Sequence, residues 1–320
     1  MRLSSIIILL IFISGSLALS NADESRSVSL TDDIGRVVTI SEAPARIISL
    51  SPSNTEILFA LGLQDRVVGV TEYCNYPPEI EELKKSGKIV EIGGYKDPDI
   101  EKIISLNPDL VLASKIQSSS TIPDLESSGI STFAVNSDNL SHVLLSIKNI
   151  GKITWKEEKA AELARNMESR IKTLSEKVDP LQKKRVLYIL WHDPLQTAGA
   201  GTVQDEVIVN AGGENIFHDL SGYPLIDPES VALKNPEIII TGVGSGERRD
   251  DPLNWARTED GIEDTDARKD DRIYQVQGDI LTRAGPRIVD ALEMIAKIIH
   301  PEAFLSILSV CHNPLPRGAH

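Results

Sequence analysis

RIISLSPSNTEILFALG, residues 46–62, carries more information about the fold than any other part of this chain. Residues 47–50 are rich in β-branched side chains and predict a short strand. Ser51 and Pro52 end this strand, because proline has no N–H group to give to a sheet. A polar loop therefore follows the carboxyl end of the strand.

The second part of the same stretch predicts a helix. Ser53 precedes Glu56 by three residues and an apolar run follows, which is the spacing of a capping box with Ser53 as the N-cap. Gly62 ends the helix. Ligands bind at the carboxyl edge of open α/β sheets, so the hydroxyl groups here predict a ligand loop. An ordinary strand–helix unit with a good cap is the alternative.

Length and charge bound the class of protein. The chain has 320 residues, 41% of them hydrophobic, which is enough for one large core or for two of ordinary size, and we expect two. Its 47 acidic and 33 basic residues give a formal net charge of −14. This charge argues against nucleic acid and against anionic membrane surfaces as partners.

Residues 1–22 have the features of a signal peptide. Arg2 supplies the positive start, residues 6–13 form a short apolar segment, and residues 20–22 give a cleavage site. We therefore expect export to the periplasm or the cell surface, where an uncleaved segment would tether the protein to the membrane. No cysteine stands near the cleavage site, so a lipoprotein anchor is not indicated.

The chain has two cysteines, Cys74 and Cys311. Their wide separation carries no spacing signal, and we expect them to be unpaired; a disulfide formed in an oxidising compartment is the alternative. No CxxC motif is present, so structural zinc is not expected.

Two segments repeat the same order of elements. In DPDIEKIISLNPDLVLA (residues 97–113) and DPESVALKNPEIIIT (residues 227–241), Asp-Pro opens a short helix, Asn-Pro ends it, and an apolar strand follows. RIISLSP, from Arg46, is likewise echoed by RVLYILWHDP, from Arg185. Two pairs in the same order predict two similar α/β halves.

A long helix is predicted between the halves. Residues 155–177 lack glycine and proline, and their apolar side chains recur every three or four positions. Some 22 helical residues would extend about 33 Å, enough to run along both halves; a surface helix of one domain is the alternative. The predicted boundaries are 1–22 for the signal peptide, 23–152 for the first lobe, 153–180 for the bridging helix, 181–303 for the second lobe and 304–320 for a tail.

The second half contains further predicted elements. Residues 204–210 predict a helix, and residues 273–276 predict a strand. QGDILTRAG, residues 277–285, then predicts a loop, and Pro286 stands in the first turn of a final helix.

Catalytic signatures are absent from the sequence. It contains neither GxSxG nor HExxH, and its glycine-rich segments lack the spacing of a phosphate loop. His192 beside Asp193 is the best ionisable pair, for which a hydrogen-bonded loop histidine is the alternative. We expect no catalytic residue, no cofactor and no resident metal.

Several motifs together resemble one family. SLSPSNTEILFALG, the YPP loop, NPDLVLAS, AGGENIF, PES and TRAGPRIVDALEMIAKIIHPE resemble the substrate-binding proteins of ABC importers for cobalamin, siderophores and haem. The resemblance covers about residues 28–301, and AGGENIF is most similar to the cobalamin-binding branch. It implies an α/β fold with two Rossmann-like lobes, one long connecting helix, little hinge motion and a ligand cleft between the lobes.

The resemblance also implies which residues face the cleft. A corrinoid presents a broad, largely apolar ring rimmed with amides, which suits aromatic faces with a few polar groups. Packing within a lobe is the alternative for Tyr95, Trp191 and Tyr223. The candidate ligand-binding residues are Ser51, Pro52, Ser53, Asn54, Tyr73, Tyr95 and Lys115 in the first lobe, and Trp191, Tyr223, Asp279 and Arg283 in the second.

In this family an exposed acid on each lobe docks onto basic residues of the permease. Glu229 matches the second-lobe acid, and Glu82 is the first-lobe candidate, followed by Glu79 and Glu81. Acids on separate lobes would set the register on the transporter and speed encounter. Each of them is otherwise a solvated acid on a helix face.

These features predict a monomeric, exported binding protein that captures cobalamin or another corrinoid and delivers it to an ABC importer permease. A ferric siderophore or haem carrier is the alternative, because Arg283 and Lys115 would also pair with an anionic chelate. A metal-dependent enzyme of similar bilobal fold, using His192 and Asp193, is the alternative of another class.

Overall fold

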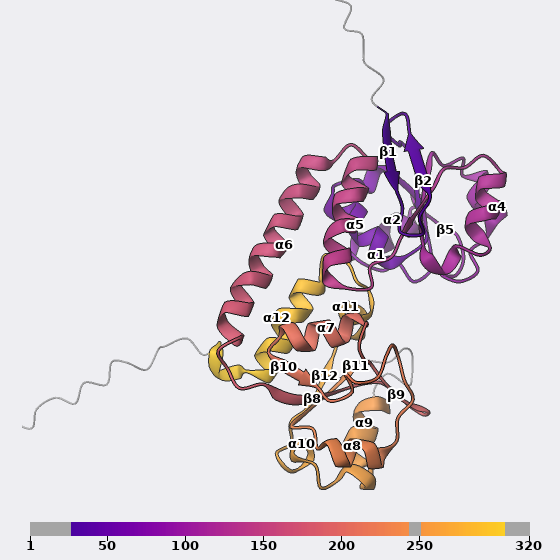
Figure 1. The fold of residues 1–320 in the computed structure, drawn as a ribbon. Helices are drawn as coiled ribbons and strands as arrows, with labels where there is room; N and C mark the ends of the chain where they lie inside the picture. The colour runs from indigo at the N-terminus through magenta and orange to yellow at the C-terminus, as the bar shows by residue number, and fades with distance from the viewer. Residues whose placement is uncertain (1–26, 243–250, 305–320) are drawn as a thin grey trace, which may run out of the picture.

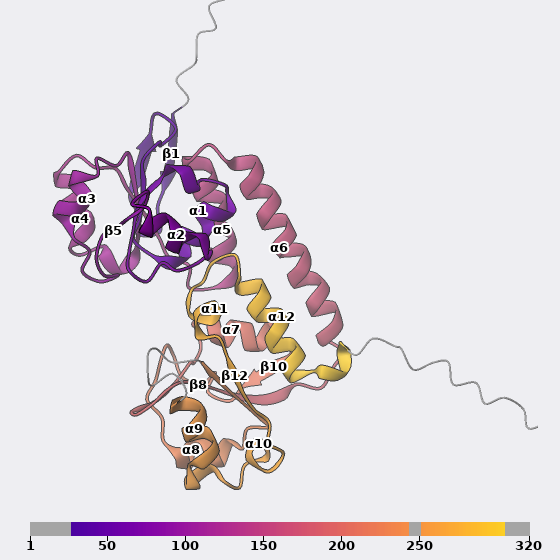
Figure 2. The same ribbon diagram turned by 180° about the vertical axis from the view of Figure 1, so that it is seen from behind.

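The computed structural model describes residues 27–242 and 251–304. Two α/β lobes are joined along one side by the helix α6 (Glu157–Val178), which runs past both of them in Figure 1 and in the reverse view of Figure 2. The earlier half of the chain forms one lobe and the later half forms the other. The predicted α/β class with two lobes and one long connecting helix is confirmed.

The first lobe is built on a five-stranded sheet with parallel pairings and the strand order β5-β4-β3-β6-β7. The central strand β3 is fully buried, as expected for a strand of a parallel sheet that is covered on both faces. The strands are β3 (Ile47–Ser49), β4 (Val67–Val70), β5 (Val90–Glu91), β6 (Leu110–Ser114) and β7 (Thr132–Val135).

Helices cover both faces of this sheet. Ile47 packs in one core with side chains of α1 and α5, and its neighbour Ile48 packs in another with those of α3 and α4. This alternation follows from the two-residue period of a strand. The helices of this lobe are α1 (Pro52–Ala60), α2 (Glu79–Lys85), α3 (Ile100–Ser105), α4 (Thr121–Ser127) and α5 (Leu140–Ile153).

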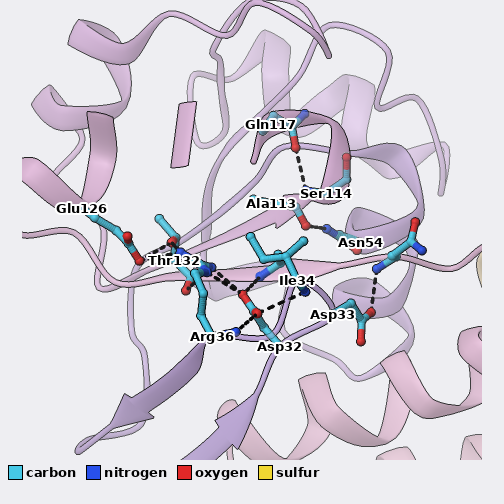
Figure 3. A network of polar contacts seen from close by, with 12 residues as sticks. Asp32, Asp33, Ile34, Arg36, Asn54, Ala113, Ser114, Gln117, Glu126 and Thr132 are labelled. Carbon is cyan, nitrogen blue, oxygen red and sulfur yellow. Dashed lines mark hydrogen bonds and ion pairs between the residues drawn. The ribbon is translucent and has the colours of Figure 1, made fainter. Parts of the chain in front are cut away.

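A hairpin of β1 (Val28–Thr31) and β2 (Val37–Ile40) is fixed to the first lobe by its turn. Asp32 accepts hydrogen bonds from the backbone N–H of Arg36 at 2.8 Å and from that of Ala134 in β7 at 3.1 Å. Figure 3 shows this carboxylate between the hairpin and the sheet. The hairpin is therefore part of the lobe.

The second lobe repeats the plan. Its strands β10, β8, β11 and β12 are parallel in that order, and β9 pairs antiparallel with β8. The strands are β8 (Lys184–His192), β9 (Leu195–Thr197), β10 (Gly213–Asn215), β11 (Ile238–Gly242) and β12 (Ile273–Val276). The helices are α7 (Val203–Asn210), α8 (Pro228–Lys234), α9 (Asp251–Thr258), α10 (Asp266–Lys269), α11 (Gly278–Thr282) and α12 (Ile288–Ile299).

The connecting helix α6 packs against α5 of the first lobe and α12 of the second. It begins at Glu157 and not at Trp155, because Trp155 has a φ of 58°, outside the right-handed helical region. The helices α5 and α6 cross closely: a Cβ atom on Gly151 would lie 2.2 Å from that of Ala160. Glycine is therefore required at this crossing.

The predicted N-cap of α1 is wrong by two residues. Ser51 is the N-cap, with extended backbone, and its Oγ accepts from the backbone N–H of Asn54 at 3.3 Å. Pro52 takes the first helical position, where its fixed φ fits and its missing N–H costs nothing. Gly62 ends the helix as predicted, with a φ of 71°.

QGDILTRAG was also predicted incorrectly, because Gly278–Thr282 forms the helix α11 within it. The side chain of Leu281 is buried in the core and stabilises this short turn. Pro286 lies ahead of α12, in a turn closed by the Ile288 N–H, which donates to the Gly285 carbonyl at 3.0 Å.

The two repeated segments form matching helix ends. Asn107 and Asn235 both adopt left-handed φ values, 47° and 43°, just after α3 and α8. The helix starts differ: Asp227 caps α8, whereas α3 is capped by Asp99 and not by Asp97. The first copy carries a second aspartate two residues on, which takes over the cap.

Cys74 is a buried free thiol. Thr55 Oγ1 donates to its Sγ at 3.2 Å, and burial raises the pKa of the thiol. Cys311 lies outside the described residues, so the expectation that the two cysteines do not pair stays a prediction.

Candidate functional site

A cavity of about 600 Å³ lies between the lobes. We call it the tyrosine cavity, because Tyr73 and Tyr95 contribute aromatic walls. It is lined from the first lobe by Ser51, Pro52, Ser53, Tyr73, Tyr95, Lys96 and Asp97, and from the second by Asp279, Thr282 and Arg283.

Both walls follow the carboxyl ends of parallel strands. The first-lobe residues come after β3, β4 and β5, and the second-lobe residues lie on or just after α11, which follows β12. The lobes therefore face each other with the edges at which open α/β sheets bind ligands.

A second cavity, of about 410 Å³, adjoins the first. The two share the lining residues Ser53, Tyr95 and Thr282, so they lie side by side between the lobes. We call the second the lysine cavity, because Lys115 lines it beside Ser114 at the carboxyl end of β6.

Tyr95 is held in place from two sides. Its hydroxyl group and that of Ser114 lie 2.8 Å apart, and its carbonyl accepts from the side-chain amide of Gln117. Gln117 is itself buried, and its Oε1 accepts from the Ser114 backbone N–H at 2.6 Å, as Figure 3 shows. The ring is therefore positioned before any ligand arrives.

Tyr73 is more open, with 53% of its surface exposed. The charge of neighbouring Glu72 raises the pKa of the phenol above its ordinary value, so the side chain is neutral at physiological pH. Tyr73 therefore offers an aromatic face and a neutral hydroxyl group.

The charges of the tyrosine cavity balance. Arg283 pairs with Asp279 at 3.1 Å and also donates to the amide oxygen of Asn75 on the other lobe. Lys96 and Asp97 stand next to each other on the opposite wall. Two cations and two anions thus line the space that the tyrosines enclose.

A second polar contact joins the lobes beside the cavity. Glu56 in α1 accepts from Arg287 Nε at 2.9 Å, and both side chains are largely buried. The Arg287 guanidinium also lies 3.6 Å from the ring centroid of Tyr76. Burial raises the pKa of Glu56, although the bond to Arg287 acts in the opposite direction.

Asn54, a predicted ligand-binding residue, is only 1% exposed and does not line either cavity. Its Nδ2 donates to the Ala113 carbonyl at 3.1 Å, which ties α1 to β6 (Figure 3). Its position supports the loop around Ser53 and does not expose the amide to a ligand.

Trp191 and Tyr223 also lie outside the linings of both cavities. The chain turns back after His192 to form β9, and Trp191 Nε1 donates to the Asp193 carbonyl at 3.0 Å within that turn. The hydroxyl group of Tyr223 donates to Gln204 Oε1 at 3.1 Å. The structure therefore groups eight predicted residues around the two cavities: Ser51, Pro52, Ser53, Tyr73, Tyr95, Lys115, Asp279 and Arg283.

The candidate docking acids are exposed on separate lobes. Glu82 lies on α2 and bonds Lys85 at 3.0 Å, and Glu229 lies in the first turn of α8. The neighbouring Glu81 pairs with Lys84 at 3.5 Å. Exposed pairs of this kind are weak and exchange easily for a partner's cation.

Sequence reasoning missed three residues of the tyrosine cavity: Lys96, Asp97 and Thr282. Lys96 and Asp97 follow Tyr95 directly, and Thr282 precedes Arg283. Their positions after β5 and β12 could therefore have marked them as candidates. The Glu56–Arg287 contact had no such signal, since 231 positions separate the two residues.

The alternative site at His192 and Asp193 does not gather metal ligands. Over residues 27–242 and 251–304, no group of three or more histidine, cysteine, aspartate or glutamate side chains is placed to hold a metal ion. Nor does this part of the chain contain a helix that is both long and apolar enough to cross a membrane.

Two α/β lobes on one connecting helix, a cavity between their facing edges and a match to a family of solute-binding proteins together define a solute-binding protein of the ABC-importer type and not an enzyme. The chain belongs to the periplasmic binding protein family, whose sequence profile matches residues 47–279.

Its relatives and structural neighbours are solute-binding proteins. An uncharacterized ABC transporter substrate-binding lipoprotein of Bacillus subtilis is 35% identical over 285 residues, 87% of each chain. The periplasmic vitamin B12-binding protein of Vibrio cholerae superimposes with a TM-score of 0.69 and 28% identity, over 82% of this chain and 99% of that one. The periplasmic heme-binding protein RhuT of Roseiflexus sp. RS-1 superimposes with a TM-score of 0.70 and 26% identity, over 81% and 98%.

Proposed function

We propose that this protein captures a corrinoid such as cobalamin between its lobes and delivers it to an ABC importer. The observation that carries the proposal is the tyrosine cavity, in which Tyr73 and Tyr95 offer aromatic surface beside a balanced set of charges. A corrin ring needs apolar contact over its face and neutral hydrogen bonding around its rim. A cavity without net charge suits this ligand.

Two further observations support the same ligand. The AGGENIF motif resembles the cobalamin-binding branch, and the vitamin B12-binding protein of Vibrio cholerae shares the fold over nearly its whole length. The contact between Glu56 and Arg287 holds the lobes together beside the cavity, which suits a site that changes little on binding.

The second candidate is haem or a ferric siderophore. Lys96 and Lys115 favour it, since neither makes an ion pair within the ranges that the structure describes and both line the interlobe space. Anionic chelates would pair with such cations. The structural similarity to a heme-binding protein supports this candidate as well.

For delivery, we propose that Glu82 and Glu229 contact basic residues of the permease. They lie on different lobes and are exposed, which suits a carrier that docks as a monomer across its cleft. We also propose export through residues 1–22, a segment outside the described residues, with membrane attachment where this segment is retained.

Calorimetric titration of the purified mature chain tests the ligand. Cyanocobalamin, a ferric hydroxamate and haemin are titrated separately, and Arg283→Ala serves as the site variant with exposed Lys88→Ala as its control. We expect one-to-one binding of cyanocobalamin that weakens in the Arg283 variant only. Binding of haemin or the hydroxamate alone would establish the second candidate, and binding of none would contradict both.

A further inference from the structure

The lysine cavity differs from the tyrosine cavity in its charge. Among the described residues that line it, Lys115 is the single charged one. The tyrosine cavity instead sets Lys96 and Arg283 against Asp97 and Asp279. An uncompensated cation in a concave site raises the local concentration of anions.

Two acids, Asp33 and Asp138, hydrogen-bond the lining residue Asn136 and form no ion pair with Lys115. Asp33 accepts from the backbone N–H of Asn136 at 2.6 Å. Asp138 accepts from the Asn136 side-chain amide at 2.8 Å and bonds the ring of His142. Lys115 itself is exposed and forms no ion pair with any residue of the described ranges. Its ammonium group is therefore available.

The hydroxyl groups of Tyr95 and Ser114, beside Lys115, leave one hydrogen between them for a ligand. Tyr95 and Ser114 share one hydrogen bond of 2.8 Å, so one of their two hydroxyl hydrogens stays unused. Thr282, by contrast, donates its hydroxyl hydrogen to the Gly278 carbonyl at 2.9 Å. An ammonium group and a hydroxyl donor side by side match the acceptor oxygens of a phosphate or a carboxylate.

Since the two cavities adjoin at Ser53 and Tyr95, a ligand with a side arm can contact both. Building on the proposed function, we infer that the ligand is bipartite: its ring lies in the tyrosine cavity, and an oxyanion on a side arm lies against Lys115. The shared chemistry is an acidic oxygen on a flexible arm. It is supplied by the phosphodiester of the nucleotide arm in a cobalamin, or by a propionate in haem.

The test compares each ring with and without its anion. Cyanocobalamin is titrated beside dicyanocobinamide, which lacks the nucleotide arm, and haemin beside its dimethyl ester. Each ligand is measured on the wild-type chain, on Lys115→Gln, on Lys96→Gln as the lysine of the other cavity, and on Lys88→Gln as an exposed lysine outside both linings. The measurement is the Kd at low and at high salt.

For whichever ring binds, we expect the anionic form to bind the wild-type chain about tenfold more tightly than the form without the anion. Lys115→Gln should abolish that preference and leave the affinity for the ring without the anion unchanged. Lys96→Gln and Lys88→Gln should keep the preference, and high salt should reduce it.

Equal weakening of both forms by Lys115→Gln, or no preference in the wild-type chain, would overturn the inference while a corrinoid function stood. Binding of haemin but of no corrinoid, with the preference for the free acid, would support the inference and overturn the corrinoid proposal. Binding of neither ring would overturn both.

Discussion

Glu56 in α1 and Arg287, just ahead of α12, form an ion pair across the two lobes, with Arg287 Nε 2.9 Å from Glu56 Oε2. Only 2% of the Glu56 side chain and 16% of the Arg287 side chain are exposed. Removing one partner of a buried pair leaves an uncompensated charge. Removing one partner of the Glu56–Arg287 pair should therefore destabilise the protein more than replacing both partners with apolar residues.

We expect Arg287→Ala to lower the free energy of unfolding by about 3 kcal/mol at pH 7, as measured by urea denaturation. Arg170→Ala is the control, because Arg170 also bonds acids of α12 but at a more exposed position. Its effect should stay below about 1 kcal/mol. Similar losses in the two variants would show that the interlobe pair has no special role.

The pH dependence of the same pair has a defined sign. Burial raises the pKa of Glu56 in the folded protein above its ordinary value. At a pH between the ordinary pKa of Glu56 in the unfolded chain and its raised pKa in the folded protein, the folded state binds more protons than the unfolded state. The contribution of Glu56 to stability therefore falls as the pH rises through this window. Urea unfolding of the wild type and Glu56→Gln between about pH 4 and pH 7 checks this. We expect the wild type to lose stability relative to the variant with rising pH; a gain would contradict the raised pKa.

Two variants of Tyr95 distinguish the contribution of its ring to ligand binding from that of its hydroxyl group. Tyr95→Phe keeps the ring and loses the hydrogen bond with Ser114, so the Kd of the ring ligand should change by less than about fivefold. Tyr95→Ala removes the ring and should raise the Kd by about tenfold or more. Tyr223→Ala, a tyrosine outside both cavity linings, should leave it unchanged. Calorimetry checks all three; a large effect of Tyr223→Ala would place the ligand elsewhere.

Gly151→Ala should destabilise the protein although alanine favours helices more than glycine does. The added Cβ would lie 2.2 Å from that of Ala160, so α5 and α6 must separate. We expect a loss of about 1–3 kcal/mol in urea unfolding. Ser169→Ala, on an exposed face of α6, should change stability by less than about 0.5 kcal/mol. An unchanged free energy of unfolding in Gly151→Ala would mean that α5 and α6 can move apart without cost.

The regular elements could be predicted because their signals are local. Residues 273–276 form β12 with the predicted bounds, since they are a short stretch of strand-forming residues between turn residues. The N-cap at Ser51 could also have been predicted, because proline is common at the first position of a helix and Pro52 directly follows Ser51. This signal is at least as strong as the spacing between Ser53 and Glu56.

The site was less accessible to prediction. The family resemblance placed Tyr73, Tyr95 and Trp191 at the cleft. Tyr73 and Tyr95 line the tyrosine cavity, whereas Trp191, whose strand turns straight back into β9, lies outside both cavity linings. A hairpin at a strand end has no strong local signal here. The pairing of Glu56 with Arg287 depends on how two separately folded lobes meet, which no sequence period encodes.

In the described ranges the chain passes from one lobe to the other once, through α6. All strands of the first-lobe sheet lie within residues 47–135, and those of the second begin at Lys184. The strand pairings of each sheet therefore join residues of one lobe only, so each lobe can fold as a unit. During vectorial synthesis or translocation the first lobe can complete its sheet before the second lobe emerges, and the meeting of Glu56 with Arg287 becomes a late docking step between two finished units.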